Sequence, residues 1–175
     1  RVIFIIYTGL FSEEGVAAVP NVAILTDSVA CVPEDIIAAL NIRWVAYYIH
    51  RGKEVLRDLV TIQRDEFIRW LLTAETLPTT ASPGPGDYYQ MFEKLVAEGY
   101  REVVTIHITS KSSGAYQAAM VAYEMACERL PQLRIEVIDT LNVSMCQGWM
   151  VIEAARMAAA GCSFEEIVQK VRSMI

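Results

Sequence analysis

Short apolar runs alternate with longer segments that carry helix signals along most of the chain. The apolar runs are rich in β-branched and aromatic side chains, which predicts strands; they cover residues 21–26, 42–49, 103–108 and 135–138. The intervening segments repeat apolar residues every three or four positions, or have a proline or glycine at one end, which predicts helices; they cover residues 33–40, 63–72, 87–98, 115–130 and 147–160. This order predicts an α/β fold of three layers (α/β/α), in which helices cover both faces of a mostly parallel central sheet.

Shorter signals mark the rest of the chain. Residues 78–86 contain three prolines and two glycines, which predicts a loop without regular structure. A polar turn precedes Val55 and Leu56, and these two residues predict a short return strand. Ser163 and Glu166 have the spacing of a capping box, which predicts the start of a last helix.

The first 20 residues stand apart from this pattern. Residues 2–11 are apolar, but the run is shorter than the ~18 residues that a membrane span needs. We interpret it as a buried strand or as part of an appended segment. The expected organisation is an N-terminal extension of uncertain origin in residues 1–20 and one α/β lobe in residues 21–175.

Composition narrows the functional classes. The 175-residue chain is 54% hydrophobic and 21% charged, which excludes an intrinsically disordered chain. Its net charge is −6, so it offers no basic stripe for phosphates and we expect no nucleic-acid partner. Since no apolar run could span a bilayer and no clear export signal is present, we expect a cytoplasmic protein.

The four cysteines lack the spacing of a zinc site. None forms a C-x-x-C pair, and neither histidine lies near them in the sequence. We therefore expect no metal and no other cofactor. We expect the thiols of Cys127 and Cys146, which lie among alanine and methionine, to pack as small hydrophobic side chains.

Polar residues gather where the predicted strands end. The carboxyl ends of parallel strands meet at one edge of a sheet, and ligands bind there. The clusters at strand ends, or in a loop that reaches this edge if it folds over the sheet, are Thr26, Asp27 and Ser28; residues 79–82; residues 109–114; and Asp139.

Ser113 and Gly114 begin a predicted helix, where free backbone N–H groups and the helix dipole favour an anion. Ser113 either caps this helix or donates its hydroxyl to a ligand, and capping is the commoner role of serine at such a position. Small side chains repeat along the helix and would let it approach the sheet closely. They are Ala115, Ala118, Ala119, Ala122 and Ala126.

Signals of catalysis are weak. The sequence contains no G-x-S-x-G nucleophile elbow, no Walker A motif and no dinucleotide-binding glycine pattern. His107 lies within a predicted strand, and we expect it to be a satisfied core histidine. Asp27 and Asp139 could chelate a metal, but strand-end carboxylates more often cap turns. Hydroxyls without a base predict binding rather than bond breaking.

Several of these segments resemble, in the same order, the DegV family of bacterial fatty-acid-binding proteins. The resemblance runs from about residue 21 to the end of the chain. It rests on residues 24–28 (ILTDS), Arg57 and Asp58 with Phe67, residues 78–86 (PTTASPGPG), residues 108–117 (ITSKSSGAYQ), and residues 137–140 (VIDT) with Ser144, Met145 and Gly148. The chain departs from the family at Ala81, where the family has a serine, and at Ala115, where it has a threonine.

The resemblance implies a non-catalytic carrier that binds a long-chain fatty acid. The acyl chain would run into the apolar interior. The residues implied for the fatty-acid carboxylate are Thr80, Ser82, Ser113 and Gly114. Those implied to line the pocket or to support the strand ends are Thr26, Asp27, Ser28 and Asp139.

The resemblance also implies partners. Relatives present their fatty acid to a separate kinase, which makes acyl phosphate for phospholipid synthesis, so a fatty acid kinase is the implied partner. The family continues into a second domain that closes the lipid pocket, and nothing in this chain matches that domain. We therefore expect the first lobe alone, whose exposed apolar surface would be covered in a homodimer or by a separate second lobe.

Two other functions stay open at this point. One is an interaction or regulatory lobe with an incomplete lipid site. The other is a small-molecule enzyme of unknown reaction that uses Asp27, Asp139 and Ser113, and this enzyme would need a base or a metal that the sequence does not reveal.

Overall fold

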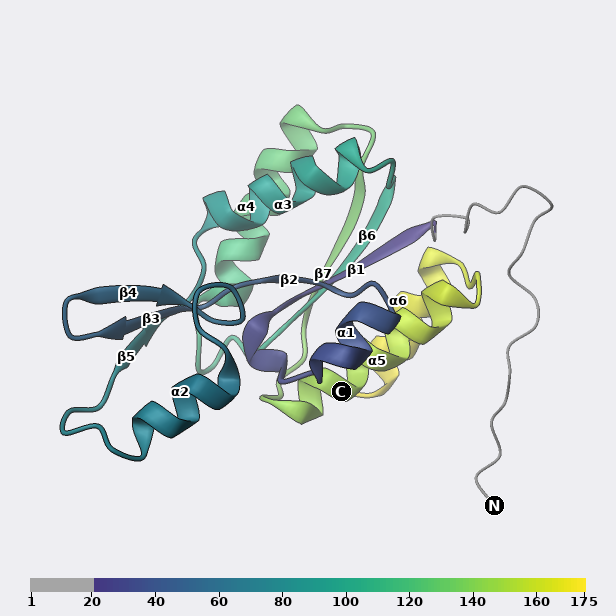
Figure 1. The fold of residues 1–175 in the computed structure, drawn as a ribbon. Helices are drawn as coiled ribbons and strands as arrows, with labels where there is room; N and C mark the ends of the chain where they lie inside the picture. The colour runs from purple at the N-terminus through teal and green to yellow at the C-terminus, as the bar shows by residue number, and fades with distance from the viewer. Residues whose placement is uncertain (1–20) are drawn as a thin grey trace, which may run out of the picture.

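A four-stranded sheet forms the centre of the computed structural model, which describes residues 21–175 (Figure 1). Its strands are β1 (Val22–Asp27), β2 (Arg43–Val45), β6 (Glu102–His107) and β7 (Arg134–Asp139). They lie in the order β2-β1-β6-β7, and each neighbouring pair is parallel. All six residues of β1 are buried, as expected for a central parallel strand covered on both faces. The predicted parallel sheet is confirmed.

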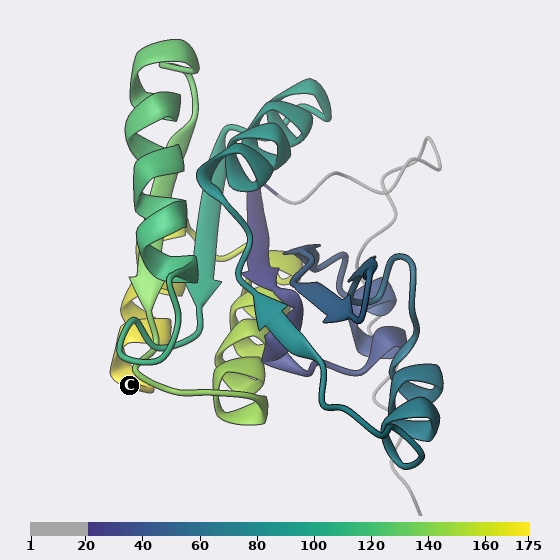
Figure 2. The same cartoon turned by 90° about the vertical axis from the view of Figure 1, so that its left-hand side faces the viewer.

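Helices cover both faces of this sheet (Figures 1 and 2), so the predicted three-layer architecture is confirmed. One face is covered by α1 (Glu34–Ala39), α5 (Met145–Ala159) and α6 (Phe164–Ser173), and the other by α3 (Pro85–Ala97) and α4 (Ala115–Arg129). Strand β1 supplies both cores, since Ile24 packs with the first group of helices and Leu25 with the second. In residues 21–175, no helix has the length and apolarity that crossing a membrane requires.

Helix α4 presents its small side chains to the sheet, as predicted. All five alanines of the stripe are buried, and all of them except Ala115 belong to the same core as Leu25 and Val103. The helix begins at Ala115, directly after the loop that follows β6. Its first turn is therefore placed by tight packing rather than by a flexible connection.

A smaller antiparallel sheet stands beside the main sheet (Figure 1). Its strands are β3 (Tyr48–Arg51), β4 (Glu54–Arg57) and β5 (Thr79–Ala81), in the order β4-β3-β5. Helix α2 (Arg64–Leu71) connects β4 to β5, and none of its residues is buried. The return strand predicted at Val55 and Leu56 is confirmed as part of β4.

Two predictions in this region are wrong. Residues 42–49 do not form one strand, because the chain leaves the main sheet after Val45 and the amide of Tyr47 donates to the Ser28 hydroxyl instead of to a neighbouring strand. Residues 78–86 are not wholly irregular, since β5 pairs with β3 and α3 begins at Pro85. All three prolines lie outside β5 and remove none of its amides, and proline fits the first position of a helix.

Local predictions at helix surfaces and helix ends had different outcomes. The capping box of α6 is confirmed, because the Ser163 hydroxyl accepts from the amide of Glu166 and the Glu166 carboxylate accepts from the amide of Ser163. Cys127 and Cys146 are exposed, so the prediction that their thiols are packed is wrong. Apolar neighbours in the sequence lie on several faces of a helix, and α4 and α5 turn these two positions towards solvent.

Gly148 allows α5 to lie against the turn that follows β1. A Cβ at this position would lie 2.5 Å from the backbone oxygen of Ala30, which cannot rotate away. We expect Gly148→Ala to destabilise the fold by about 1–3 kcal/mol, the usual cost of overpacking. Gly86 in α3 has open space around it, so Gly86→Ala is the control and should be neutral or stabilising by up to about 1 kcal/mol. Urea unfolding compares the two variants, and equal free energies of unfolding would contradict the close contact.

Candidate functional site

A cavity of about 780 Å³ lies where the segments that follow β1 and β6 meet the smaller sheet and α2. This volume is within the range of small-molecule binding sites. The cavity therefore occupies the edge of the sheet at which the sequence predicted a ligand, beyond the carboxyl ends of the parallel strands.

The four residues predicted to hold a carboxylate all line this cavity: Thr80, Ser82, Ser113 and Gly114. They come from two segments far apart in the sequence, β5 with the residue after it and the loop before α4. These segments meet closely, since a Cβ added at Gly114 would lie 3.5 Å from the Ser82 hydroxyl oxygen. The structure thus brings the four predicted residues to one place, and their role towards a carboxylate stays a prediction.

Ser113 has a structural partner at the start of α4. Its hydroxyl oxygen accepts a hydrogen bond from the amide of Ala115 at 3.3 Å. The same oxygen lies 2.6 Å from the hydroxyl oxygen of Tyr47. The Ser113 hydroxyl therefore accepts from the first amide of α4, although the N-cap position itself is Gly114 and has no side-chain cap. Ser113 still lines the cavity.

Tyr47 is a lining residue that the sequence analysis missed. The side chain is 7% exposed, and its phenol reaches Ser113 at the polar side of the cavity. Burial raises the pKa of Tyr47 to about 12, so the phenol keeps its proton throughout the neutral range. The only signal was a pair of adjacent tyrosines in an apolar run, and such a run does not tell which tyrosine faces a cavity.

Apolar side chains form much of the remaining wall. They come from the turn after β1, from β3, from α2 and from the end of β6: Val29, Ile49, Phe67, Ile68 and Ile108. Among the described residues that line the cavity, Arg64 alone is basic, and its guanidinium donates to the carbonyl oxygen of Val32 at 2.9 Å. Arg64 was also missed, because one arginine at the start of a predicted helix is typical of a solvated position.

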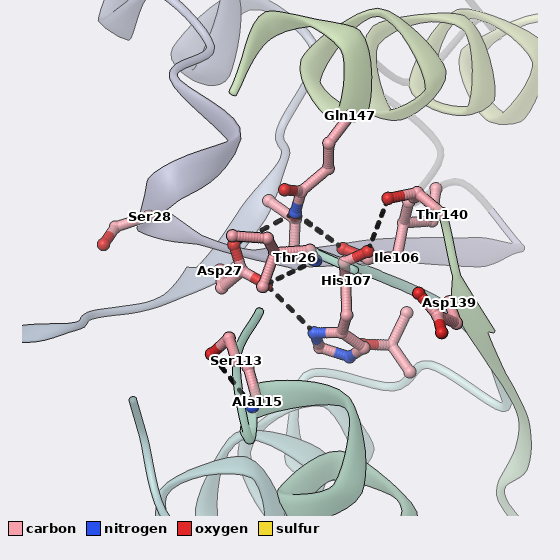
Figure 3. A network of polar contacts seen from close by, with 12 residues as sticks. Thr26, Asp27, Ser28, Ile106, His107, Ser113, Ala115, Asp139, Thr140 and Gln147 are labelled. Atoms are coloured by element: carbon pink, nitrogen blue, oxygen red, sulfur yellow. Dashed lines mark hydrogen bonds and ion pairs between the residues drawn. The ribbon is translucent and has the colours of Figure 1, made fainter. Parts of the chain in front are cut away.

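Asp27 lies behind the cavity and does not line it. Its side chain is fully buried, and Figure 3 shows it between β6 and α5. One carboxylate oxygen accepts from the Gln147 amide at 3.0 Å, and the other accepts from the backbone amide of Ile108 at 3.2 Å. Its second oxygen is also 3.3 Å from Nδ1 of His107. Asp27 therefore joins the ends of β1 and β6 to α5.

His107 is a hydrogen-bonded core residue, as the sequence predicted. It is fully buried, and its Nε2 lies 2.6 Å from the hydroxyl of Thr105 while its Nδ1 faces Asp27. Tyr88 packs edge-on against the ring, with 5.0 Å between the ring centroids. The Ser113 hydroxyl contacts Tyr47 and Ala115 rather than this histidine, so the arrangement offers Ser113 no general base among these contacts.

The other strand-end residues divide between support and lining. The Thr26 hydroxyl donates to the carbonyl of Ile106 at 2.7 Å and does not line the cavity. Asp139 accepts from the amides of Ser110 and Leu141, so it fixes the loop before α4 from the β7 side. Ser28 lines the cavity, and its hydroxyl accepts from the amide of Tyr47 at 3.1 Å.

The site offers hydroxyl groups, an apolar wall and two charged side chains, Asp58 and Arg64. Within residues 21–175, no three His, Cys, Asp or Glu side chains cluster in a way that could hold a metal ion. Such a surface suits an amphipathic ligand with an acidic or polar head and an apolar body.

Comparison with known proteins links this fold to one family. A family model described as an uncharacterised protein of the DegV family matches residues 21–175, which confirms the resemblance predicted from the sequence. A DegV domain-containing protein of Caldanaerobacter subterraneus is 38% identical over 155 residues, which are 89% of this chain and 53% of that protein. The chain spans about half the length of the curated relatives it matches.

Solved structures agree with this comparison. A stearic-acid-binding protein of Eubacterium ventriosum superposes with a TM-score of 0.77 at 28% identity, over 85% of this chain and 51% of that one. The fatty acid kinase B3 protein of Streptococcus pneumoniae, loaded with linoleic acid, superposes with a TM-score of 0.71 at 25% identity, over 87% of this chain and 53% of that one. Both neighbours are described as binding a fatty acid.

Removal of the Asp27 carboxylate tests its supporting role. Asp27→Ala removes the acceptor of the Ile108 amide, the partner of the His107 ring and one of the three acceptors of the Gln147 side-chain amide. We expect it to destabilise the fold by about 2–4 kcal/mol. Asp139→Ala serves as the control, because that half-buried carboxylate accepts two loop amides and its removal should cost about 1 kcal/mol. Urea unfolding provides both values, and a smaller cost at Asp27 than at Asp139 would contradict this assignment.

The raised pKa of Tyr47 predicts a loss of stability at alkaline pH. An unfolded tyrosine titrates near pH 10, whereas burial raises the pKa of Tyr47 to about 12 in the folded protein. Between these two pKa values the folded state holds a proton that the unfolded chain has lost, so the free energy of unfolding falls as pH rises. Urea unfolding at pH 9 and pH 11.5 should show a fall that is smaller by about 1–2 kcal/mol in Tyr47→Phe. The same fall in both proteins would mean that the phenol is not shielded.

Proposed function

This chain belongs to the DegV family, and from that premise we propose that residues 21–175 bind a long-chain fatty acid in the cavity beside the main sheet. In this proposal the chain is a carrier lobe and performs no catalytic step. The observation that carries the proposal is a cavity with apolar walls and a group of hydroxyls at the start of α4. The stearic-acid-binding and linoleic-acid-loaded neighbours support the same ligand class.

The acyl chain supplies most of the binding free energy. Each buried methylene contributes about 0.8 kcal/mol, so roughly 14 methylenes contribute on the order of 11 kcal/mol before ordering costs. The wall formed by Ile49, Phe67 and Ile108 is the surface on which the acyl chain would lie. A carrier whose binding free energy comes mainly from the tail accepts fatty acids of related length. It discriminates among them by how well the tail packs against the apolar wall of the cavity.

The head group is held by local donors. The chain carries a net charge of −6, so its long-range field does not attract an anion. We propose that the hydroxyls of Thr80, Ser82 and Ser113 donate to the carboxylate beside Gly114, where the first turn of α4 adds its dipole. Each charge-assisted hydrogen bond contributes about 1.5–3 kcal/mol, which sets the position of the head group and selects an acid.

Partners follow from the same family membership. We propose that the lobe presents its fatty acid to a fatty acid kinase, because one structural neighbour is a fatty acid kinase B protein. The cytoplasmic location and the division at residues 20 and 21 stay predictions.

Exposed apolar side chains around α2 favour an associated second lobe. Leu72 and Leu77 are 81% and 83% exposed, and Ile68, which also lines the cavity, is 53% exposed. A partner that covers α2 would bury these side chains and would also close the cavity. We propose that a second lobe or a second copy of the chain occupies this position.

Native mass spectrometry of the purified chain tests the proposed ligand directly. The expected result is a stoichiometric small molecule that is identified as a fatty acid after denaturation. A chain that retains no fatty acid and also fails to bind added palmitate would contradict the proposal.

Ser113→Ala tests the proposed head-group site. Loss of one charge-assisted hydrogen bond of about 1.5–3 kcal/mol predicts palmitate affinity that is roughly 10- to 100-fold weaker, with the fold retained. Ser110→Ala is the matched control, because Ser110 belongs to the same loop but does not line the cavity. Thr80→Val and Thr79→Val form a second pair on β5, where Thr80 alone lines the cavity. Titration of each variant with palmitate gives the affinities, and equal affinities within both pairs would remove the assigned roles.

A further inference from the structure

Two adjacent tyrosines, the residue before β3 and the first residue of β3, contact the beginnings of two different helices. The phenol of Tyr48 donates to the Asp87 carboxylate at 2.8 Å, in the first turn of α3. The phenol of Tyr47 lies 2.6 Å from the Ser113 hydroxyl, just before α4. Tyr47 lines the cavity and Tyr48 does not, so the pair combines one residue of the site with a natural control outside it.

The backbone of Tyr47 is held on both sides. Its amide donates to the Ser28 hydroxyl at 3.1 Å, and its carbonyl oxygen accepts from the amide of Asp58 at 3.0 Å. The side chain is buried, so its ring has little freedom to leave the position beside Ser113. The phenol is therefore a preorganised partner of that serine.

The hydrogen-bonding capacity of Ser113 determines what this partner does. A serine hydroxyl has one hydrogen and two acceptor lone pairs. One lone pair accepts from the amide of Ala115. If Tyr47 donates across the 2.6 Å contact, the second lone pair is also occupied and the hydroxyl hydrogen is left to point elsewhere, into the cavity that Ser113 lines.

The opposite arrangement would disfavour an anion. If Ser113 donated to Tyr47, its hydrogen would be consumed and a lone pair would face the cavity. A phenol is a far stronger acid than an aliphatic alcohol, and burial keeps it protonated at neutral pH, so Tyr47 is the better donor of the two. A carboxylate bound next to Ser113 selects this same direction, because the hydrogen bond from Tyr47 to Ser113 then strengthens the one from Ser113 to the carboxylate.

We propose that Tyr47 is a positioning residue that directs the Ser113 hydroxyl hydrogen into the cavity, and that it thereby makes the site prefer an ionised carboxylate over an uncharged lipid alcohol of the same length. This inference rests on the proposed fatty-acid site. It goes beyond that proposal by assigning the selection of the acid to a residue that does not itself need to touch the ligand.

The test compares two ligands with the same tail. Palmitate carries a carboxylate, whereas 1-hexadecanol can both donate and accept and is therefore indifferent to the direction of the Ser113 hydroxyl. Affinities of both are measured by displacement of one fluorescent fatty-acid probe from the parent chain, Tyr47→Phe, Tyr48→Phe, Ser113→Ala and the Tyr47→Phe/Ser113→Ala double variant. Tyr47→Phe removes one oxygen and keeps the buried ring, and circular dichroism and melting of each variant monitor the fold.

The expected result is that Tyr47→Phe weakens palmitate binding roughly fivefold and leaves hexadecanol binding unchanged. Tyr48→Phe should change neither affinity. In the Ser113→Ala background, Tyr47→Phe should have no further effect on the ratio of the two affinities, because the hydroxyl that it directs is gone.

Two results would overturn the inference while leaving the proposed function in place. One is an equal loss for palmitate and hexadecanol in Tyr47→Phe, which would mean that the ring only shapes the cavity. The other is a further loss of palmitate selectivity when Tyr47→Phe is added to Ser113→Ala, because that loss could not act through the Ser113 hydroxyl. A parent chain that binds no palmitate would instead overturn the proposed function, and the inference with it.

Discussion

The arrangement of the site depends on the carboxylate of Asp27. This group is fully buried, and it is compensated by the side-chain amide of Gln147, the backbone amide of Ile108 and the contact with His107. A buried carboxylate without such partners would be costly, so the ends of β1 and β6 and the first turn of α5 have little freedom to separate. The loop that leaves β6 consequently starts from a fixed point (Figure 3).

Further contacts carry this constraint from Asp27 to the hydroxyl of Ser113. The amide of Thr109 donates to the carbonyl of Asn142, and the amide of Ser110 donates to Asp139, so the loop is held from the β7 side. The amide of Ser113 then donates back to the carbonyl of Thr109. Because the loop is bonded along its length, a ligand that binds Ser113 does not have to order it, and that saving in conformational entropy favours binding.

The sequence predicted those parts of the molecule that depend on local pattern. The parallel sheet, the buried alanines of α4 and the capping box of α6 follow from periodicity and from the side chains at helix ends. The break between β2 and β3 does not, because an apolar run has the same pattern whether it stays in one sheet or passes to a second. The missed role of Tyr47 has the same cause, since its partner Ser113 lies 66 positions further along the chain. Strand-end chemistry could be located from the sequence, but the contacts between distant loops that define the cavity could not.

The exposure of the site residues fits the proposed role as a carrier. Thr80 and Gly114 are exposed, whereas Ile49, on the apolar wall of the same cavity, is buried. A fatty acid bound in the proposed orientation would therefore keep its carboxylate at the accessible side and its tail against the buried wall. Hydroxyls hold a carboxylate less strongly than a buried charge pair does, so the head group can exchange its donors for those of a second protein while the tail stays in place. In such a carrier the tail determines whether the ligand stays bound, and the weakly held head determines whether it can be used by the next protein.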